Sequence, residues 1–193
     1  MKKFDEKVLS SPQSVLHCLP VTPAALLLIL ATLLTIISCE YKRPEIIYAE
    51  PASTPLTNSF TSLDDLAQAF LTAIADSSTE DMYKLCVTED EYKNIIWRRL
   101  SEHKQQMIPL DDAWEWVVRD NDKVVRRWLQ DYGKMKFRLI DFHPEGRTFK
   151  EDSMTVFQTL MTVEDEYGDT YDWKVMNRVV NINDTYKVIV YND

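Results

Sequence analysis

The sequence predicts an α+β domain over residues 61–193, in which helices come first and an antiparallel sheet follows. Two patterns along the chain support this prediction. Up to about residue 132, apolar side chains recur every three or four positions, the spacing of one face of an amphipathic helix. From Lys134 onward the period is two, and β-branched and aromatic residues alternate with polar ones between turn signals, which is typical of strands.

The helical half begins with a first helix whose start is well marked. Thr61 or Ser62 can cap it, and Asp64 and Asp65 follow in the first turn, where the helix dipole favours acidic side chains. A short second helix is expected from Thr79, with its apolar side chains turned inward.

Two further helices are predicted before the sheet. Thr88 and Glu91 have the spacing of a capping box, and the apolar stripe behind them continues to Leu100, after which a polar stretch ends the helix. The longest helix follows Pro109, and Gly133 is placed to stop it.

The strand-like stretches are separated by turn residues. They span residues 136–142, 154–167, 170–182 and 186–191. Breaks are expected at Pro144-Glu145-Gly146, in the acidic segment 164–169 and at Asn183-Asp184. Because the connections between consecutive strands are short, we expect an antiparallel meander.

Residues 24–37 form the most apolar run of the chain and predict a signal peptide. The run carries no charge and is shorter than the roughly 20 residues that a membrane-spanning helix needs, but it suits the core of a signal peptide. It leads into Ile36-Ile37-Ser38-Cys39, which resembles the lipobox read by bacterial lipoprotein maturation enzymes. The resemblance implies cleavage before Cys39, attachment of a diacylglycerol to its sulfur, and a place in the cell envelope facing the periplasm or the exterior. An uncleaved anchor over residues 15–38 is the alternative.

The chain therefore divides into a signal peptide over residues 1–38, a lipidated cysteine with its tether over residues 39–60, and the α+β domain over residues 61–193. The tether is expected to be flexible because proline, serine and threonine fill it without a lasting period. Beyond Cys39 the only cysteine is Cys86, so packing rather than a disulfide must hold the domain.

The composition restricts the class of partner. Hydrophobic residues make up 45% and charged residues 27% of the chain, as in globular proteins. The net charge of −9 at pH 7 argues against binding to nucleic acid, whose phosphates repel an acidic surface. The lipid on Cys39 is therefore the expected contact with the membrane.

The first two predicted helices carry a further resemblance. Residues 62–76, SLDDLAQAFLTAIAD, followed by DMYKL at residues 81–85, resemble the opening of nuclear transport factor 2-like, or SnoaL-like, domains. The resemblance covers about residues 61–193. It implies a cone-shaped, cystatin-like fold, with N-terminal helices packed on a curved antiparallel sheet and a pocket between them. Members of that superfamily divide into enzymes, which place an Asp, His or Tyr in the pocket, and plain binders.

The sequence offers candidate site residues but no recognisable catalytic set or cofactor motif. Asp141 and His143 are the candidates for an acid or base, although a turn residue is the simpler interpretation of His143. Trp97 and Trp116 fall off the apolar stripes of their helices, so either is a candidate for a pocket wall or a partner face. A partly covered surface tryptophan is the simpler interpretation of both. The acidic segment 164–169 matches no calcium-binding loop and the histidines are few, so no metal or cofactor is expected.

Two functions remain open. The favoured hypothesis is a membrane-anchored envelope lipoprotein whose non-catalytic domain binds a small apolar ligand or an envelope protein partner. The alternative is a small isomerase- or cyclase-type enzyme that uses a pocket carboxylate or histidine, Asp141 or His143. The first is favoured because no acid–base pair can be recognised in the sequence.

Overall fold

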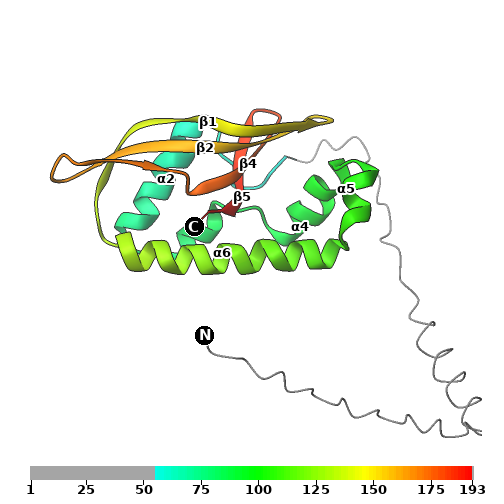
Figure 1. Ribbon diagram of the computed structural model, residues 1–193, viewed down its shortest axis with the longest axis horizontal. Coiled ribbons are helices and arrows are strands. Elements are labelled where there is room, and N and C mark those ends of the chain that lie inside the picture. Colours follow the sequence, from blue (N-terminus) through cyan, green and yellow to red (C-terminus); the bar gives the residue numbers. More distant parts are fainter. Residues whose placement is uncertain (1–54, 193) are drawn as a thin grey trace, which may run out of the picture. The chain divides into compact units, whose positions relative to one another are not determined.

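The computed structural model describes residues 55–192, and in this range helices precede a five-stranded antiparallel sheet (Figure 1). The predicted α+β class is confirmed. The predicted signal peptide, the lipidation site Cys39 and most of the predicted tether lie outside the described residues. Within the described range, no helix has both the length and the apolar character needed to cross a bilayer.

The helical half is a series of short elements that ends in one long helix. In chain order the elements are α2 (Leu63–Ala75), α3 (Thr79–Lys84), α4 (Glu89–Glu91), the π-helical turn η1 (Tyr92–Ile96), the 3-10 turn η2 (Trp97–Arg99), α5 (Glu102–Met107) and α6 (Leu110–Tyr132). The strands are β1 (Phe137–Glu151), β2 (Met154–Asp165), β3 (Thr170–Trp173), β4 (Met176–Ile182) and β5 (Thr185–Tyr191).

Polar side chains set the starts of the first helices, as the sequence predicts. The Ser62 hydroxyl accepts a hydrogen bond from the Asp65 N–H at 3.0 Å and caps α2. Ser78 caps α3 in the same way. Thr88 and Glu91 form the predicted capping box at α4. These bonds satisfy backbone N–H groups that the first turn of a helix leaves unpaired.

The segment after α4 departs from the predicted regular helix. The chain passes through the π turn and the 3-10 turn before Leu100 adopts an extended conformation. The polar stretch that was expected to end the helix forms α5. Because a π turn adds a residue to the helical repeat, it rotates the side chains that follow it. Trp97, which lies off the apolar stripe of a regular helix, is buried for this reason.

β2 lies in the interior of the sheet, whose strand order is β1-β2-β4-β5, and β3 pairs with β2 as well. β3 and β4 divide the predicted strand 170–182, and both run antiparallel to β2. The turn before β5 is the predicted one, with Asn183 and Asp184 in the left-handed conformation at φ 51° and 58°. Two consecutive left-handed residues match the twist of a tight hairpin.

The predicted break in the first strand is wrong. Residues 144–146 do not end β1; they belong to an irregular stretch between the pairs Pro144–Thr159 and Thr148–Phe157. β1 is an edge strand, where proline and bulges are tolerated because one side of the strand has no partner. Gly146, at φ 85°, supplies a left-handed residue at the irregularity.

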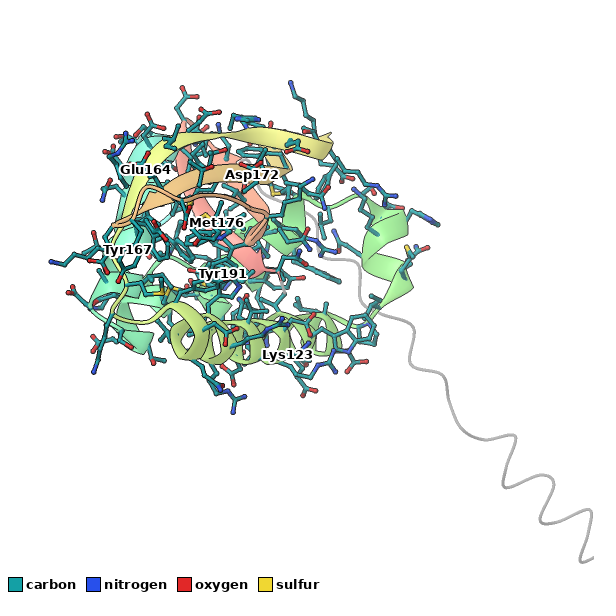
Figure 2. All side chains as sticks on the ribbon, turned by 60° about the vertical axis from the view of Figure 1, so that its left-hand side comes forward. Lys123, Glu164, Tyr167, Asp172, Met176 and Tyr191 are labelled. Atoms are coloured by element: carbon teal, nitrogen blue, oxygen red, sulfur yellow. The ribbon has the colours of Figure 1, made fainter. Side chains whose placement is uncertain are left out.

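Two clusters of buried side chains fill the space between the helices and the sheet. The closed core is centred on Phe70, Ile74, Val125, Met161, Trp173 and Tyr191. The open core is centred on Ile95, Trp97, Ala113, Val117, Val156 and Val190. Helix α6 contributes to both clusters, and Figure 2 shows Tyr191 between the strands and this helix.

The segment ahead of α2 also packs on the domain. Leu56 is buried in the open core, and Phe60 pairs with Tyr186 of β5. Thr57 donates both its N–H and its hydroxyl to the carboxylate of Glu91. The folded part of the chain therefore begins inside the segment that the sequence assigns to the tether.

Candidate ligand-binding cavity

A cavity of about 590 Å³ lies beside the open core and is lined by residues of α5, the first half of α6 and the sheet. Its lining side chains are Tyr92, Trp97, Leu100, Lys104, Met107, Ile108, Ala113, Trp116, Val117, Asp120, Phe149, Asn177, Arg178 and Val190. Most of them are apolar. They come from helices and from three strands, so tertiary packing rather than one stretch of sequence creates the cavity.

The cavity brings together both tryptophans that the sequence singles out. Trp97 is 3% exposed and belongs to the wall, whereas Trp116 is 47% exposed and lies at the rim. Trp97 is thus not the partly covered surface residue that was expected. Its ring packs on Tyr92, with the ring centroids 6.2 Å apart. Met107 and Phe149 add exposed apolar surface to the same rim.

One polar atom of this wall is buried without a partner. No described residue accepts a hydrogen bond from Nε1 of Trp97. Leaving a buried N–H unsatisfied costs about 1–3 kcal/mol.

Arg178 reaches the cavity through an irregularity in the pairing of β4 with β5. Met176 pairs with Tyr191 and Arg178 pairs with Val190, so Asn177 is an extra residue on β4. A bulge of this kind twists the strand and changes the direction of its side chains. Asn177 and Arg178 are neighbours in sequence, and both line the cavity together with Val190.

The other cation of the wall is already neutralised. Lys104 forms an ion pair with Glu151, and its Nζ lies 4.1 Å from the ring centroid of Phe149. Asp120, the carboxylate of the wall, lies 3.4 Å from the guanidinium of Arg119 in an exposed pair. These two charges of the wall therefore each have a partner of opposite sign.

Arg178 has no such partner within the described residues. Its charge acts on Tyr92 instead. Burial raises the pKa of the Tyr92 hydroxyl, and the positive charge of Arg178 opposes that rise. The two side chains, from η1 and β4, are therefore close enough to interact.

A buried ion pair attaches the wall segment to the sheet. Oε2 of Glu91 lies 2.8 Å from Nζ of Lys187 on β5, and the two side chains are 4% and 2% exposed. Thr88 and Thr57 donate further hydrogen bonds to the same carboxylate. Burial raises the pKa of Glu91, but the bonds from Lys187, Thr88 and Thr57 outweigh burial and lower it below its usual value. This network holds the chain next to Tyr92 against β5.

Asp141 and His143, the candidate acid and base, do not line the cavity. Both are exposed on β1, and Nδ1 of His143 lies 2.6 Å from Oδ2 of Asp141. Phe142 between them is buried in the closed core, and side chains alternate along a strand. The two candidates therefore meet on the outer face of the sheet, outside the pocket that the enzyme hypothesis requires.

The acidic hairpin after β2 is explained by its own hydrogen bonds. The carboxylate of Asp165 accepts from the N–H groups of Tyr167 and Asp169 and from the hydroxyl of Tyr171. Burial raises the pKa of Asp165, but these bonds outweigh burial and lower it. Between residues 55 and 192, no group of three or more His, Cys, Asp or Glu side chains is arranged to hold a metal ion.

Cys86 and His103 do not join the cavity either. Cys86 is buried in the closed core, and burial raises the pKa of its thiol to about 12, so it packs as a neutral side chain. His103 is exposed on α5.

Sequence reasoning missed Asn177 and Arg178. A signal was present, because two polar residues interrupt the apolar alternation between Val175 and Val179. Such an interruption inside a strand is typical of a bulge. The sequence does not reveal which cavity the bulge faces.

Comparison of the chain with family models, with curated proteins and with solved structures finds no match. Its function is therefore argued from the geometry of the cavity.

Proposed function

We propose that the domain is a non-catalytic binding module that holds a small apolar ligand in the 590 Å³ cavity beside the open core. The observation that carries the proposal is the cavity itself. Ligand sites typically occupy about 300–1,000 Å³ and combine an apolar and aromatic lining with a few polar groups. This cavity has that size and that kind of lining.

The rim supports the same proposal. Met107, Trp116 and Phe149 are exposed large apolar side chains, at 65%, 47% and 37%, and all three border the cavity. Exposed apolar surface that gathers around a concavity is typical of a binding site. Scattered surface residues would not converge on one opening.

The positions of the candidate acid and base favour binding over catalysis. A general base must come within hydrogen-bond reach of the proton that it removes. Asp141 and His143 bond to each other on the outer face of β1, and neither borders the cavity. The isomerase or cyclase alternative through Asp141 or His143 therefore has no support from the cavity, and Asp120, the carboxylate in its wall, is exposed and paired with Arg119.

The binding module is proposed to be attached to a membrane through lipid on Cys39. The lipobox-like Ile36-Ile37-Ser38-Cys39 motivates this part of the proposal. Expression of Cys39→Ala with a radioactive fatty acid should abolish labelling and leave the protein as an unprocessed precursor of larger mass. Labelling that persists in the variant would contradict it.

Ligand binding is tested by photo-crosslinking the full chain in its own membranes with an uncharged alkyl diazirine that carries an alkyne. The probe should label residues of α5 and the first half of α6. Ala113→Trp should abolish this labelling, because Ala113 is 7% exposed and an indole at this position fills the cavity. Lys123→Trp is the matched control, since Lys123 is an exposed residue of the same helix (Figure 2).

Resistance of the domain to protease, measured in the same membranes, shows whether each variant is folded. Val117→Phe provides a second filled cavity with a smaller change in volume. Unchanged labelling in a folded filled-cavity variant would overturn the proposal. Labelling confined to the outer face of α6 would do so as well.

A further inference from the structure

We propose that the molecule held in this cavity is a single-chain anionic amphiphile, an acyl chain that ends in a carboxylate bound by Arg178 and Asn177. This inference rests on the proposed function and names the class of its ligand. It starts from the polar groups of the wall that have hydrogen-bonding capacity left over.

These groups are mainly donors. Asn177 uses its Oδ1 to accept from Nε2 of Gln158 at 2.8 Å, which leaves its NH₂ group to donate. The guanidinium of Arg178 has no carboxylate partner within the described residues. A ligand that completes this wall must bring acceptors.

The charge of the site favours an anion over a neutral acceptor. Arg178 is exposed where it lines the cavity, and no described residue forms an ion pair with it. Lys104 and Asp120 contribute little, because Glu151 and Arg119 respectively pair with them. Arginine binds a carboxylate through two parallel hydrogen bonds, which neither water nor an alcohol reproduces.

The bulge in β4 places these donors at the cavity. It makes Asn177 an extra residue and brings its side chain and that of Arg178 to the same wall. A regular strand would send consecutive side chains to opposite faces of the sheet. Two adjacent donors on one face form a site for one planar anionic group.

The rest of the wall selects an apolar tail. Tyr92, Trp97, Trp116 and Phe149 surround a volume that a small hydrated anion such as phosphate would leave largely unfilled. An acyl chain covers this surface and removes it from water. The donors and the aromatic wall together therefore fit one amphiphile.

The test compares two photoreactive probes on the full chain in its membranes: a dodecanoate and the matching dodecanol, each with a diazirine and an alkyne. We expect dodecanoate to label the cavity at concentrations at least about tenfold below those of the alcohol, since hydrogen bonds between a guanidinium and a carboxylate are much stronger than those to a neutral hydroxyl. Arg178→Gln should abolish this difference by weakening labelling with dodecanoate to the level of labelling with the alcohol. Arg178→Lys keeps the charge but not the planar fork, so it should restore only part of the preference.

Arg138→Gln is the matched control, because this arginine is exposed on β1 and pairs with Glu164 at 2.8 Å. It should keep the full preference.

The outcomes separate the two proposals. If both probes label the cavity at equal concentrations and Arg178→Gln changes neither, the proposal of an anionic ligand is overturned. The proposal that the cavity binds an apolar ligand is then retained. Absence of cavity labelling by either probe would overturn the proposed function itself. Competition by phosphatidylglycerol vesicles but not by free dodecanoate would overturn the single-chain ligand in favour of a membrane lipid.

Discussion

The closed core and the open core lie under the same helix and against the same sheet, yet they are built differently. In the closed core, aromatic rings from α2, α6 and β3 meet directly. Trp128 packs edge-on against Trp173 at 4.8 Å and against Phe70 at 5.9 Å between ring centroids. In the open core, Trp97 and Trp116 border a cavity instead. The side chains on opposite walls of this cavity do not pack against each other.

The wall of the cavity is held along its length by buried polar side chains. Arg99 donates to the Ile95 carbonyl at 2.6 Å, and Gln105 donates to the Leu100 carbonyl at 2.8 Å. Glu91 adds its ion pair with β5. These bonds fix an irregular backbone whose carbonyl groups a regular helix would have satisfied. Hydrogen bonds of buried side chains therefore hold the chain around the cavity in place.

Removal of the buried cation should have the largest effect. Lys187→Ala leaves the Glu91 carboxylate buried without its counter-ion, which typically costs about 3–5 kcal/mol of unfolding free energy. Urea unfolding followed by tryptophan fluorescence measures the loss. Lys93→Ala is the control, because its pairs with the exposed Glu89 and Asp111 contribute about 1 kcal/mol or less. Equal losses in the two variants would show that polar bonds do not hold the open region.

Truncation of one tryptophan in each region should have unequal effects. Trp128→Ala should cost about 3 kcal/mol, because its ring lies among Phe70, Tyr132 and Trp173 and its Nε1 donates to the Asn192 carbonyl. Trp116→Ala should cost about 1 kcal/mol or less, since half of this side chain is exposed. The same urea titrations compare them. Equal losses of unfolding free energy in the two variants would contradict the distinction between a filled and a hollow region.

Addition of one methylene should have opposite signs in the two regions. Val125→Ile overfills the closed core, where the valine is fully buried, and should cost about 1–3 kcal/mol. Val117→Ile extends into the cavity and should stabilise by about 0.5 kcal/mol. Thermal unfolding of both variants measures the difference. A cost at residue 117 as large as that at residue 125 would mean that the cavity is filled.

Acidification should weaken the attachment of the cavity wall, although it has no effect near neutral pH. The folded-state pKa of Glu91 is lowered, so its stabilising contribution is complete above its ordinary pKa and is lost as the pH falls through the folded value. Unfolding free energy measured downward from pH 6 should therefore decline below about pH 4.5. Glu91→Gln should flatten this decline. An unchanged slope in the variant would assign the acid sensitivity to other carboxylates.

Local signals in the sequence predicted the parts of the fold that local interactions decide. Ser62, Thr88 and Gly133 mark helix ends because caps depend on a few adjacent residues. The Asn183-Asp184 turn was predictable as well, because asparagine and aspartate tolerate the left-handed conformation that the turn requires. The α+β class was predicted from the change of hydrophobic period. This prediction does not depend on the exact residue at which each helix or strand begins or ends.

The candidate site was only partly predictable. Trp97 and Trp116 were singled out because they break the stripes of their helices, and they do border one cavity. The π turn that buries Trp97 and the bulge that positions Arg178 depend on tertiary packing, which periodicity does not encode. Asp141 and His143 were chosen by residue type alone, and the side of the strand on which they lie was not considered.

The bonds of Thr57 and the pairing of Phe60 with Tyr186 attach the leading segment to the domain, so a pull on the chain ahead of them loads these contacts first. Phe60 and Tyr186 exchange backbone hydrogen bonds of 3.1 and 2.8 Å, and Thr57 just ahead of them is bonded to Glu91. Tension applied to the chain before Pro55 reaches the Thr57 bonds first and then the bridge to β5. Glu91, whose carboxylate fixes the cavity wall, is therefore among the first residues to bear such a force. Strain in the leading segment reaches the cavity before it reaches the closed core.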